Sequence, residues 1–93
     1  MIKSFKGKEL EYLWINGQSK KIPYILVRRV LMKLELLDVA TCIEDLRSPP
    51  SNNLHKLQGK YTDHWSVAVN GPWRLVFKII NNDIFDIILI QYH

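Results

Sequence analysis

The chain lacks the features of a disulfide-stabilised or membrane protein. It has a single cysteine, Cys42, and so cannot form an internal disulfide. No apolar run approaches the ~18 residues that a membrane span needs. The N-terminal MIKSFKGKELEYLW alternates charged and apolar residues and does not build the apolar core of a secretory signal. We therefore expect a cytoplasmic protein without a membrane partner, in which Cys42 is a small buried hydrophobe.

Length and composition limit the architecture. With 93 residues, the chain is near the lower end of what buries a self-sufficient core. It is expected to form one domain, residues 1–93, of two or three packed layers. The 47% hydrophobic and 24% charged residues exclude a disordered chain.

Charge is distributed unevenly along the chain. Residues 1–33 carry eight Lys or Arg against Glu9 and Glu11, a surplus of six, whereas residues 34–47 carry four acids against Arg47. Such asymmetry in a small chain predicts an anionic partner, of which nucleic acid is the commonest. The alternative is a solvated helix face.

The last 30 residues predict three strands joined by two turns. Residues 65–69, 73–80 and 84–90 are rich in Val, Ile, Phe and Trp, which fit a pleated surface. Asn70-Gly71-Pro72 and Asn81-Asn82 separate them with turn residues. Arg74 is a cation inside this apolar sheet, so it is either a site residue or an edge charge that reaches solvent.

The first 40 residues predict two helices. In residues 6–16, Leu10, Leu13 and Trp14 fall on one helical side, and Gly17 supplies the left-handed residue that ends helices. Pro23 suits the first turn of a second helix over residues 23–40.

The second helix is apolar on two sides. A broad face, expected to meet the sheet, consists of Leu26, Val27, Val30, Leu31, Leu34 and Leu37. Ile25, Met32 and Leu36 form a narrower opposite stripe, flanked by Arg28 and Arg29. We expect the first helix to cover this stripe, with a partner protein as the alternative.

The middle of the chain is expected to be irregular. Thr41 and Glu44 have the spacing of a capping box that opens a short turn ending near Leu46. Pro49-Pro50 stops this turn, and residues 54–57 alternate as a short strand. The whole predicts an α+β fold, two N-terminal helices packed on one face of a mostly antiparallel sheet, with the opposite face open to a ligand.

Five segments together resemble one protein family. They are MIKSFK at the start, LxxLDxAT at 34–41, LRSPPSNxL at 46–54, WSVxVNxxWRLxF at 65–77, and the terminal Tyr92-His93. In order and spacing they resemble the HigB group of RelE-like toxins of bacterial type II toxin-antitoxin modules. The resemblance implies a RelE-like microbial ribonuclease fold that cuts messenger RNA in the A site of the 30S ribosomal subunit, without metal or cofactor. It also implies neutralisation by a HigA-type antitoxin.

The reaction implied by the resemblance is attack of a ribose 2′-OH on the adjacent phosphate. It needs a base, an acid and a cation for the charged phosphate. The resemblance assigns His55 and His93 to proton transfer, Arg74 to the phosphate, and Tyr92 to a base or phosphate.

Two residues depart from the family pattern. Gln58 stands where the family commonly has lysine, and Gln91 where it commonly has an acid. These departures predict a weakened nuclease unless Lys56 or Lys60 replaces the missing charge. Lys56 is the preferred replacement if the strand continues to Gln58, since the two would share a face.

Further contacts and alternatives remain open. Ribosomal RNA is expected to contact Lys20, Lys21, Arg28 and Arg29. A two-residue turn at Asn81-Asn82 would put Gln91 and His93 on the sheet face of Arg74, and a three-residue loop would reverse this. The alternative function is a non-cleaving member that blocks the A site or acts with its antitoxin in transcriptional autoregulation; a third is a plain protein-interaction module.

Overall fold

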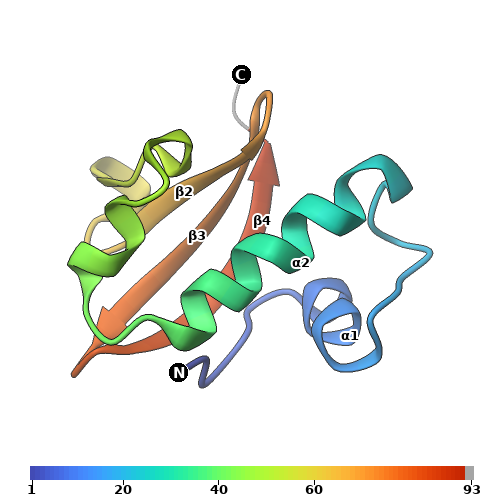
Figure 1. Ribbon diagram of the computed structural model, residues 1–93, viewed down its shortest axis with the longest axis horizontal. Helices are drawn as coiled ribbons and strands as arrows, with labels where there is room; N and C mark the ends of the chain where they lie inside the picture. Colours follow the sequence, from blue (N-terminus) through green and yellow to red (C-terminus); the bar gives the residue numbers. More distant parts are fainter. Residues whose placement is uncertain (92–93) are drawn as a thin grey trace.

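The chain is built on a four-stranded antiparallel sheet with the strand order β1-β2-β3-β4 (Figure 1). A computed structural model describes residues 1–91. Its strands are β1 (His55–Lys56), β2 (Trp65–Asn70), β3 (Trp73–Ile80) and β4 (Asp83–Gln91). Its helices are α1 (Lys8–Asn16) and α2 (Tyr24–Val39), with short 3-10 helices η1 (Ile43–Arg47), η2 (Pro50–Asn52) and η3 (Gly59–Tyr61). In residues 1–91, no helix has the length and hydropathy to cross a membrane.

Both predicted helices form, and each begins later in the sequence than expected. The backbone N–H of Lys6 donates to Ile87 O on β4, so the chain is still extended there and α1 begins only at Lys8. Gly17 ends α1 in the left-handed conformation and its N–H donates to Leu13 O, as predicted. Pro23 is the N-cap of α2 instead of its first residue.

The core lies between the helices and one face of the sheet. On α2 the broad apolar face is confirmed, because Leu26, Val30, Leu34 and Leu37 are buried. They pack in one cluster with Leu10 and Leu13 of α1 and with the sheet residues Val67, Val69, Leu75, Phe77, Ile84 and Ile87. The predicted α+β fold, with both helices on the sheet, is therefore confirmed.

The expectation that α1 covers the second stripe of α2 is wrong for Ile25 and Met32, whereas Leu36 is half-buried and packs against the core. Ile25 is 70% exposed and Met32 54% exposed, and Val39 at the end of the same side is 71% exposed. The physical reason is size: α1 has nine residues, roughly 14 Å of helix, and uses Leu10 and Leu13 in the core. An apolar side of α2 is left uncovered.

The turn after α2 is capped by a different residue from the one predicted. Asp45, not Glu44, accepts hydrogen bonds from both the backbone N–H and the hydroxyl of Thr41, each at 2.8 Å, because the turn begins one residue later than expected. These bonds lower the pKa of the Asp45 carboxyl. Cys42 is half-buried instead of buried, with its Sγ 3.7 Å from Asp45 Oδ1.

The N-terminal residues run alongside β4. Ile2 and Phe5 form parallel bridges with Ile84 and Ile87, and four backbone hydrogen bonds connect the two segments. The expected extended lead-in is thus present. It covers the outer edge of the first half of β4.

A buried polar pair ties α2 to the segment that leads into β1. Lys33 is 8% exposed and donates from Nζ to Asn52 Oδ1. Asn52 is 1% exposed, and its Nδ2 donates to Leu46 O at 3.0 Å and to Ser48 O at 3.3 Å. One amide side chain therefore satisfies three partners and holds residues 46–52 against α2.

We expect Asn52→Ala to lower the free energy of unfolding by roughly 2–3 kcal/mol, because it leaves buried donors and acceptors without partners. Urea unfolding followed by circular dichroism measures this. Ser51→Ala, at an exposed neighbouring position, is the matched control and should change little. Equal unfolding midpoints for the two variants would contradict a clamping role for Asn52.

Lys33 also predicts a pH effect. Burial, with a smaller contribution from the nearby Arg29 charge, lowers the pKa of Lys33 below its ordinary 10.5. Between the lowered pKa and 10.5, the unfolded chain binds more protons than the folded one, so stability should rise with pH in that window. Lys33→Met should reduce this rise in urea unfolding measured across alkaline pH. An unchanged slope would show that other groups cause it.

Candidate functional site

Arg74 lies on the sheet face that points away from the helices. Its neighbours Trp73 and Leu75 pack against the helix-side core, and side chains alternate along a strand. Arg74 pairs with Ala68 on β2 and Ile90 on β4, so it is held in the sheet interior and not at an edge. Its side chain is half-buried, with the Nη1 atom buried. This position fits the site reading of Arg74 better than the edge-charge reading.

His55 lies on the same face. It pairs with Ser66 on β2, which in turn pairs with Val76 on β3, two residues from Arg74. Two strand spacings and a two-residue offset put the Cα atoms of His55 and Arg74 roughly 12 Å apart. The His55 side chain is exposed. A phosphodiester group above the sheet would lie between an imidazole and a guanidinium.

The floor between these two side chains is made of small residues. On β2 this face carries Ser66 and Ala68, as the alternation of WSVAVN allows. Ser66 is fully buried and its Oγ has no hydrogen-bond partner, which costs about 1–3 kcal/mol for a buried hydroxyl. Sequence reasoning missed Ser66, although a polar residue inside an apolar strand is a visible signal.

Lys78 is a second cation on this face that sequence reasoning missed. It lies four residues after Arg74 on β3, so the alternation gives both the same side. Its Nζ is 3.8 Å from Asp86 Oδ2, and both side chains are partly exposed. The two cations extend the positive charge of this face along β3.

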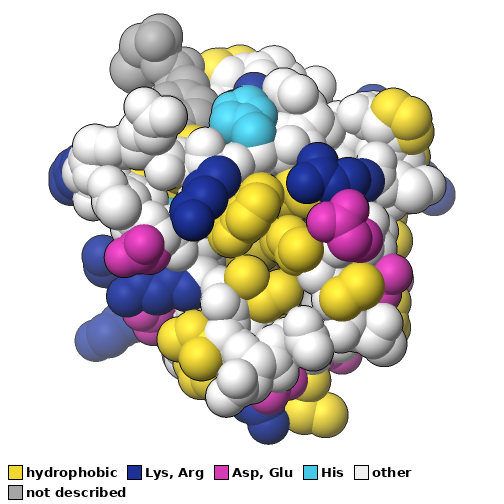
Figure 2. All heavy atoms as spheres, turned by 90° about the vertical axis from the view of Figure 1, so that its left-hand side faces the viewer, with side chains coloured by type: hydrophobic (Ala, Val, Ile, Leu, Met, Phe, Trp, Pro, Cys, Tyr) yellow, Lys and Arg dark blue, Asp and Glu magenta, His cyan; other side chains and the backbone are white. Residues whose placement is uncertain are grey.

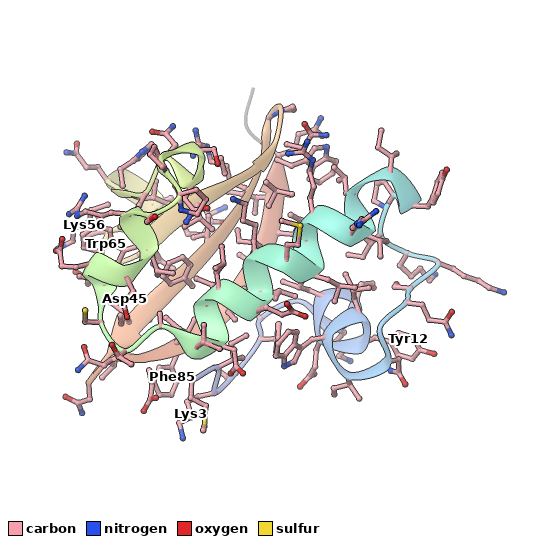
Figure 3. All side chains as sticks on the ribbon, viewed as in Figure 1. Lys3, Tyr12, Asp45, Lys56, Trp65 and Phe85 are labelled. Atoms are coloured by element: carbon pink, nitrogen blue, oxygen red, sulfur yellow. The ribbon has the colours of Figure 1, made fainter. Side chains whose placement is uncertain are left out.

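Lys56 and Lys60 are the two residues proposed to replace the positive charge that Gln58 lacks, and they lie on different sides of the sheet. β1 ends at Lys56, so the condition under which Lys56 would share a strand face with Gln58 is not met. Lys56 instead pairs with Trp65, which packs on the helix side, and the two lie together at the β1 edge (Figure 3). The structural reason for preferring Lys56 is therefore absent, and the replacement of the missing charge stays a prediction.

Lys60 lies closer to the site face. Its Nζ is 5.7 Å from the centre of the Tyr61 ring, and that ring meets His64 edge-on at 5.4 Å. His64 O accepts the backbone N–H of Leu57, the residue after the end of β1. By alternation His64 shares the face of Ser66, and Lys60 is connected to His64 through the Tyr61 ring.

The four basic residues expected to contact ribosomal RNA lie on the helical layer. Arg28 and Arg29 are exposed on α2. Lys20 and Lys21 line a hollow of about 620 Å³ that also includes Lys8 and Tyr12. Figure 3 labels Tyr12, which lies on α1. The fold does not bring these four residues to the face of His55 and Arg74.

The β3–β4 register differs from the one expected for a two-residue turn. Asn81-Asn82 is a two-residue turn, but a bulge sets Asp86 and Ile87 opposite Phe77, with Asp86 at φ 56°. The extra residue shifts the pairing by one, so Gln91 pairs with Trp73 and lies on the helix side, away from Arg74. Tyr92 and His93 are outside the described residues.

The surface near β1 combines charge with apolar area. Figure 2 shows the side of the molecule where η1, η2 and β1 lie, with hydrophobic side chains in the middle, Lys or Arg on both sides and a histidine above them.

In residues 1–91, no three His, Cys, Asp or Glu side chains gather as a metal site. The chemistry available on the site face is that of imidazole, guanidinium and ammonium groups.

Comparison with known proteins shows the family to which the sequence is similar. Residues 3–93 match the model of the RelE-like toxin of type II toxin-antitoxin system HigB. The chain is 37% identical over 93 residues, the whole of both proteins, to Endoribonuclease HigB of Proteus vulgaris. It is 34% identical to Toxin HigB-1 of Vibrio cholerae over 82 residues, 87% of this chain and 86% of that protein.

A solved structure shares the fold. A chain of the heterotetrameric YoeB-YefM toxin-antitoxin complex from Staphylococcus aureus superposes with a TM-score of 0.61 at 18% identity, covering 100% of this chain and 98% of that one. On the match over residues 3–93, the chain belongs to the HigB-like family of RelE-like toxins of type II toxin-antitoxin systems.

Proposed function

We propose that this chain is an endoribonuclease toxin that cuts messenger RNA in the ribosomal A site and is inactivated by an antitoxin protein of the HigA type. The observation that carries the proposal is that His55 and Arg74 share one sheet face above a floor of small residues. The full-length similarity to Endoribonuclease HigB supports it. The ribosome as target implies that the protein acts in the cytoplasm.

The proposed chemistry is cleavage by the neighbouring ribose hydroxyl. The 2′-OH attacks the phosphate, the 5′ oxygen leaves, and a cyclic phosphate and a 5′-hydroxyl end form. Arg74 stabilises the charge that develops on the phosphate through its fork of donors. His55 transfers a proton at one of the two oxygens, as an imidazole can near neutral pH.

Tyr92 and His93 complete the proposal on their sequence positions alone. His93 is the proposed second proton-transfer group, and Tyr92 the contact to a base or the phosphate. Both follow Gln91, the last described residue of the strand next to the one that carries Arg74.

A second candidate function is a non-cleaving toxin that binds the A site, or acts with its antitoxin on transcription. The observation in its favour is that Lys20, Lys21, Arg28 and Arg29 lie on the helical layer, apart from the site face. Gln58 and Gln91, in place of a cation and an acid, point the same way. The two candidates differ in one measurable property, the appearance of new RNA ends.

We expect Arg74→Ala to lower mRNA cleavage about 10²–10³-fold and His55→Ala about 10²–10⁴-fold, the usual effects of losing a charge-stabilising donor and a proton-transfer group. Primer extension on mRNA in a purified translation reaction measures new 5′ ends. Arg47→Ala, at an exposed arginine paired with Glu44, is the matched control and should cleave normally. Circular dichroism checks that each variant is folded.

Three results distinguish the candidates. Cleavage by the natural chain that both site variants abolish supports the nuclease. Translation arrest without new 5′ ends supports the blocking toxin. Full cleavage by folded Arg74→Ala and His55→Ala variants would overturn the proposed site.

Lys60→Ala should lower cleavage about tenfold, the effect of roughly 1.4 kcal/mol in the barrier, because Lys60 supplies the cation that Gln58 lacks. Lys56→Ala is the control of equal charge on the helix side of β1 and should change cleavage less. The same primer-extension reaction measures both. A larger loss of cleavage with Lys56→Ala than with Lys60→Ala would show that Lys56, and not Lys60, replaces the charge that Gln58 lacks.

A further inference from the structure

Ser66 carries a buried polar atom that the rest of the described chain does not satisfy. The residue is completely buried on the site face of β2, and its Oγ atom makes no hydrogen bond within residues 1–91. Buried hydroxyl groups nearly always have a partner, because an unpaired one loses its hydrogen bonds to water without compensation. A serine at such a position, inside an apolar strand, therefore points to a group that pairs with it when the site works.

The strand register shows which side chains lie next to this hydroxyl. Ser66 is directly opposite His55 on β1 and Val76 on β3. Ala68 is the next residue of β2 that points to the same face. Valine and alanine side chains form no hydrogen bonds, whereas an imidazole nitrogen can donate to a hydroxyl or accept from it. Of these neighbours, His55 alone can satisfy the Ser66 hydroxyl.

The other polar side chains near Ser66 on this face are less well placed. His64 lies two residues earlier on the same strand side, and its Nδ1 already pairs with Thr62 O at 3.2 Å. Arg74 and Lys78 lie two residues before and after the β3 partner of Ser66, so both are diagonal to it. Diagonal neighbours are about 7–8 Å apart, farther than direct cross-strand partners. The register therefore favours His55.

The separation of Ser66 and His55 suits a hydrogen bond. Directly opposite residues of antiparallel strands have Cβ atoms about 4.5–5.5 Å apart. Serine Oγ is one bond beyond Cβ and histidine Nδ1 is two bonds beyond it, so the two atoms can approach to about 3 Å. The pair is not hydrogen-bonded in the described structure. Because the His55 side chain is exposed, its ring can rotate about χ1 and χ2 onto the hydroxyl.

We propose that Ser66 is a positioning residue, which holds the His55 imidazole by a hydrogen bond between its Oγ and Nδ1. Nδ1 is the ring nitrogen nearer to the strand, so this bond turns Nε2 away from the sheet and towards the RNA. It also fixes which of the two nitrogens carries the proton. The inference rests on the proposed function, in which His55 transfers a proton during cleavage. Ser66 itself is completely buried and acts only through His55.

Cleavage by three variants tests this role. Ser66→Ala should lower kcat for mRNA cleavage about 10- to 100-fold, the effect of misplacing a reacting group, with little change in KM. Ser66→Cys has a similar volume but only a weak donor, so it should lose cleavage as well. Ser66→Thr keeps the hydroxyl and should retain most of the cleavage. Primer extension over a range of mRNA concentrations measures all three, and Ser51→Ala, at an exposed serine, is the matched control.

Stability separates positioning from a structural role. Ser66→Ala removes a buried hydroxyl that has no partner, so its urea midpoint should equal or exceed that of the natural chain. Ser66→Ala should therefore lose cleavage without losing stability. A lower midpoint together with an unchanged His55 ring would show that Ser66 serves packing, and would overturn the proposal. Full cleavage by Ser66→Ala or by Ser66→Cys would overturn it as well.

Nuclear magnetic resonance of the full chain observes His55 directly and needs no RNA. The chemical shifts of its ring nitrogens, measured above the pH at which the imidazole loses its charge, report which nitrogen carries the proton. The tautomer populations should differ between the natural chain and Ser66→Ala, and Ser66→Thr should restore them. A chain that never cleaves mRNA but shows this difference keeps the positioning role and loses the proposed function. A chain that cleaves mRNA, with the same His55 populations in Ser66→Ala, keeps the function and loses the positioning role.

Discussion

The packing of α2 on β2 and β3 determines where every other side chain of the sheet lies. Val67, Val69, Leu75 and Phe77 are almost completely buried against the helices. Because side chains alternate along a strand, this burial turns Ser66, Ala68 and Arg74 to the opposite face. A one-residue slip in the register of β3 would bury the Arg74 guanidinium in the core. The apolar packing against the helices therefore also fixes the orientation of the candidate site.

Much of the fold could be predicted from residue patterns, and the predictions that were wrong have physical causes. Period-two and helical periodicities located all four strands and the buried face of α2, since burial imposes both. The β4 bulge at Asp86 leaves no such pattern, because a positive φ at one residue is not visible in an apolar run. β1 has only two residues, and the alternation of residues 54–57 does not show that the strand ends before Gln58.

The candidate site was predictable in part. His55 and Arg74 followed from family resemblance, and the strand register brings them to one face, which no local pattern gives. Ser66 joins them through its pairing across the strands, and Lys78 through the alternation along β3. The uncovered side of α2 depends on how far a nine-residue helix reaches, a tertiary property that the repeat of Ile25 and Met32 does not encode.

The pairing of the N-terminal lead-in with β4 joins the first residues of the chain to nearly the last. Asp86 N donates to Ser4 Oγ across 82 positions of sequence. During synthesis, Ile2 and Phe5 leave the ribosome long before Ile84 and Ile87 are made, so their side of the sheet stays open until translation of the chain is almost finished. The N-terminal segment therefore cannot pair with β4 before Ile84 and Ile87 have been synthesised.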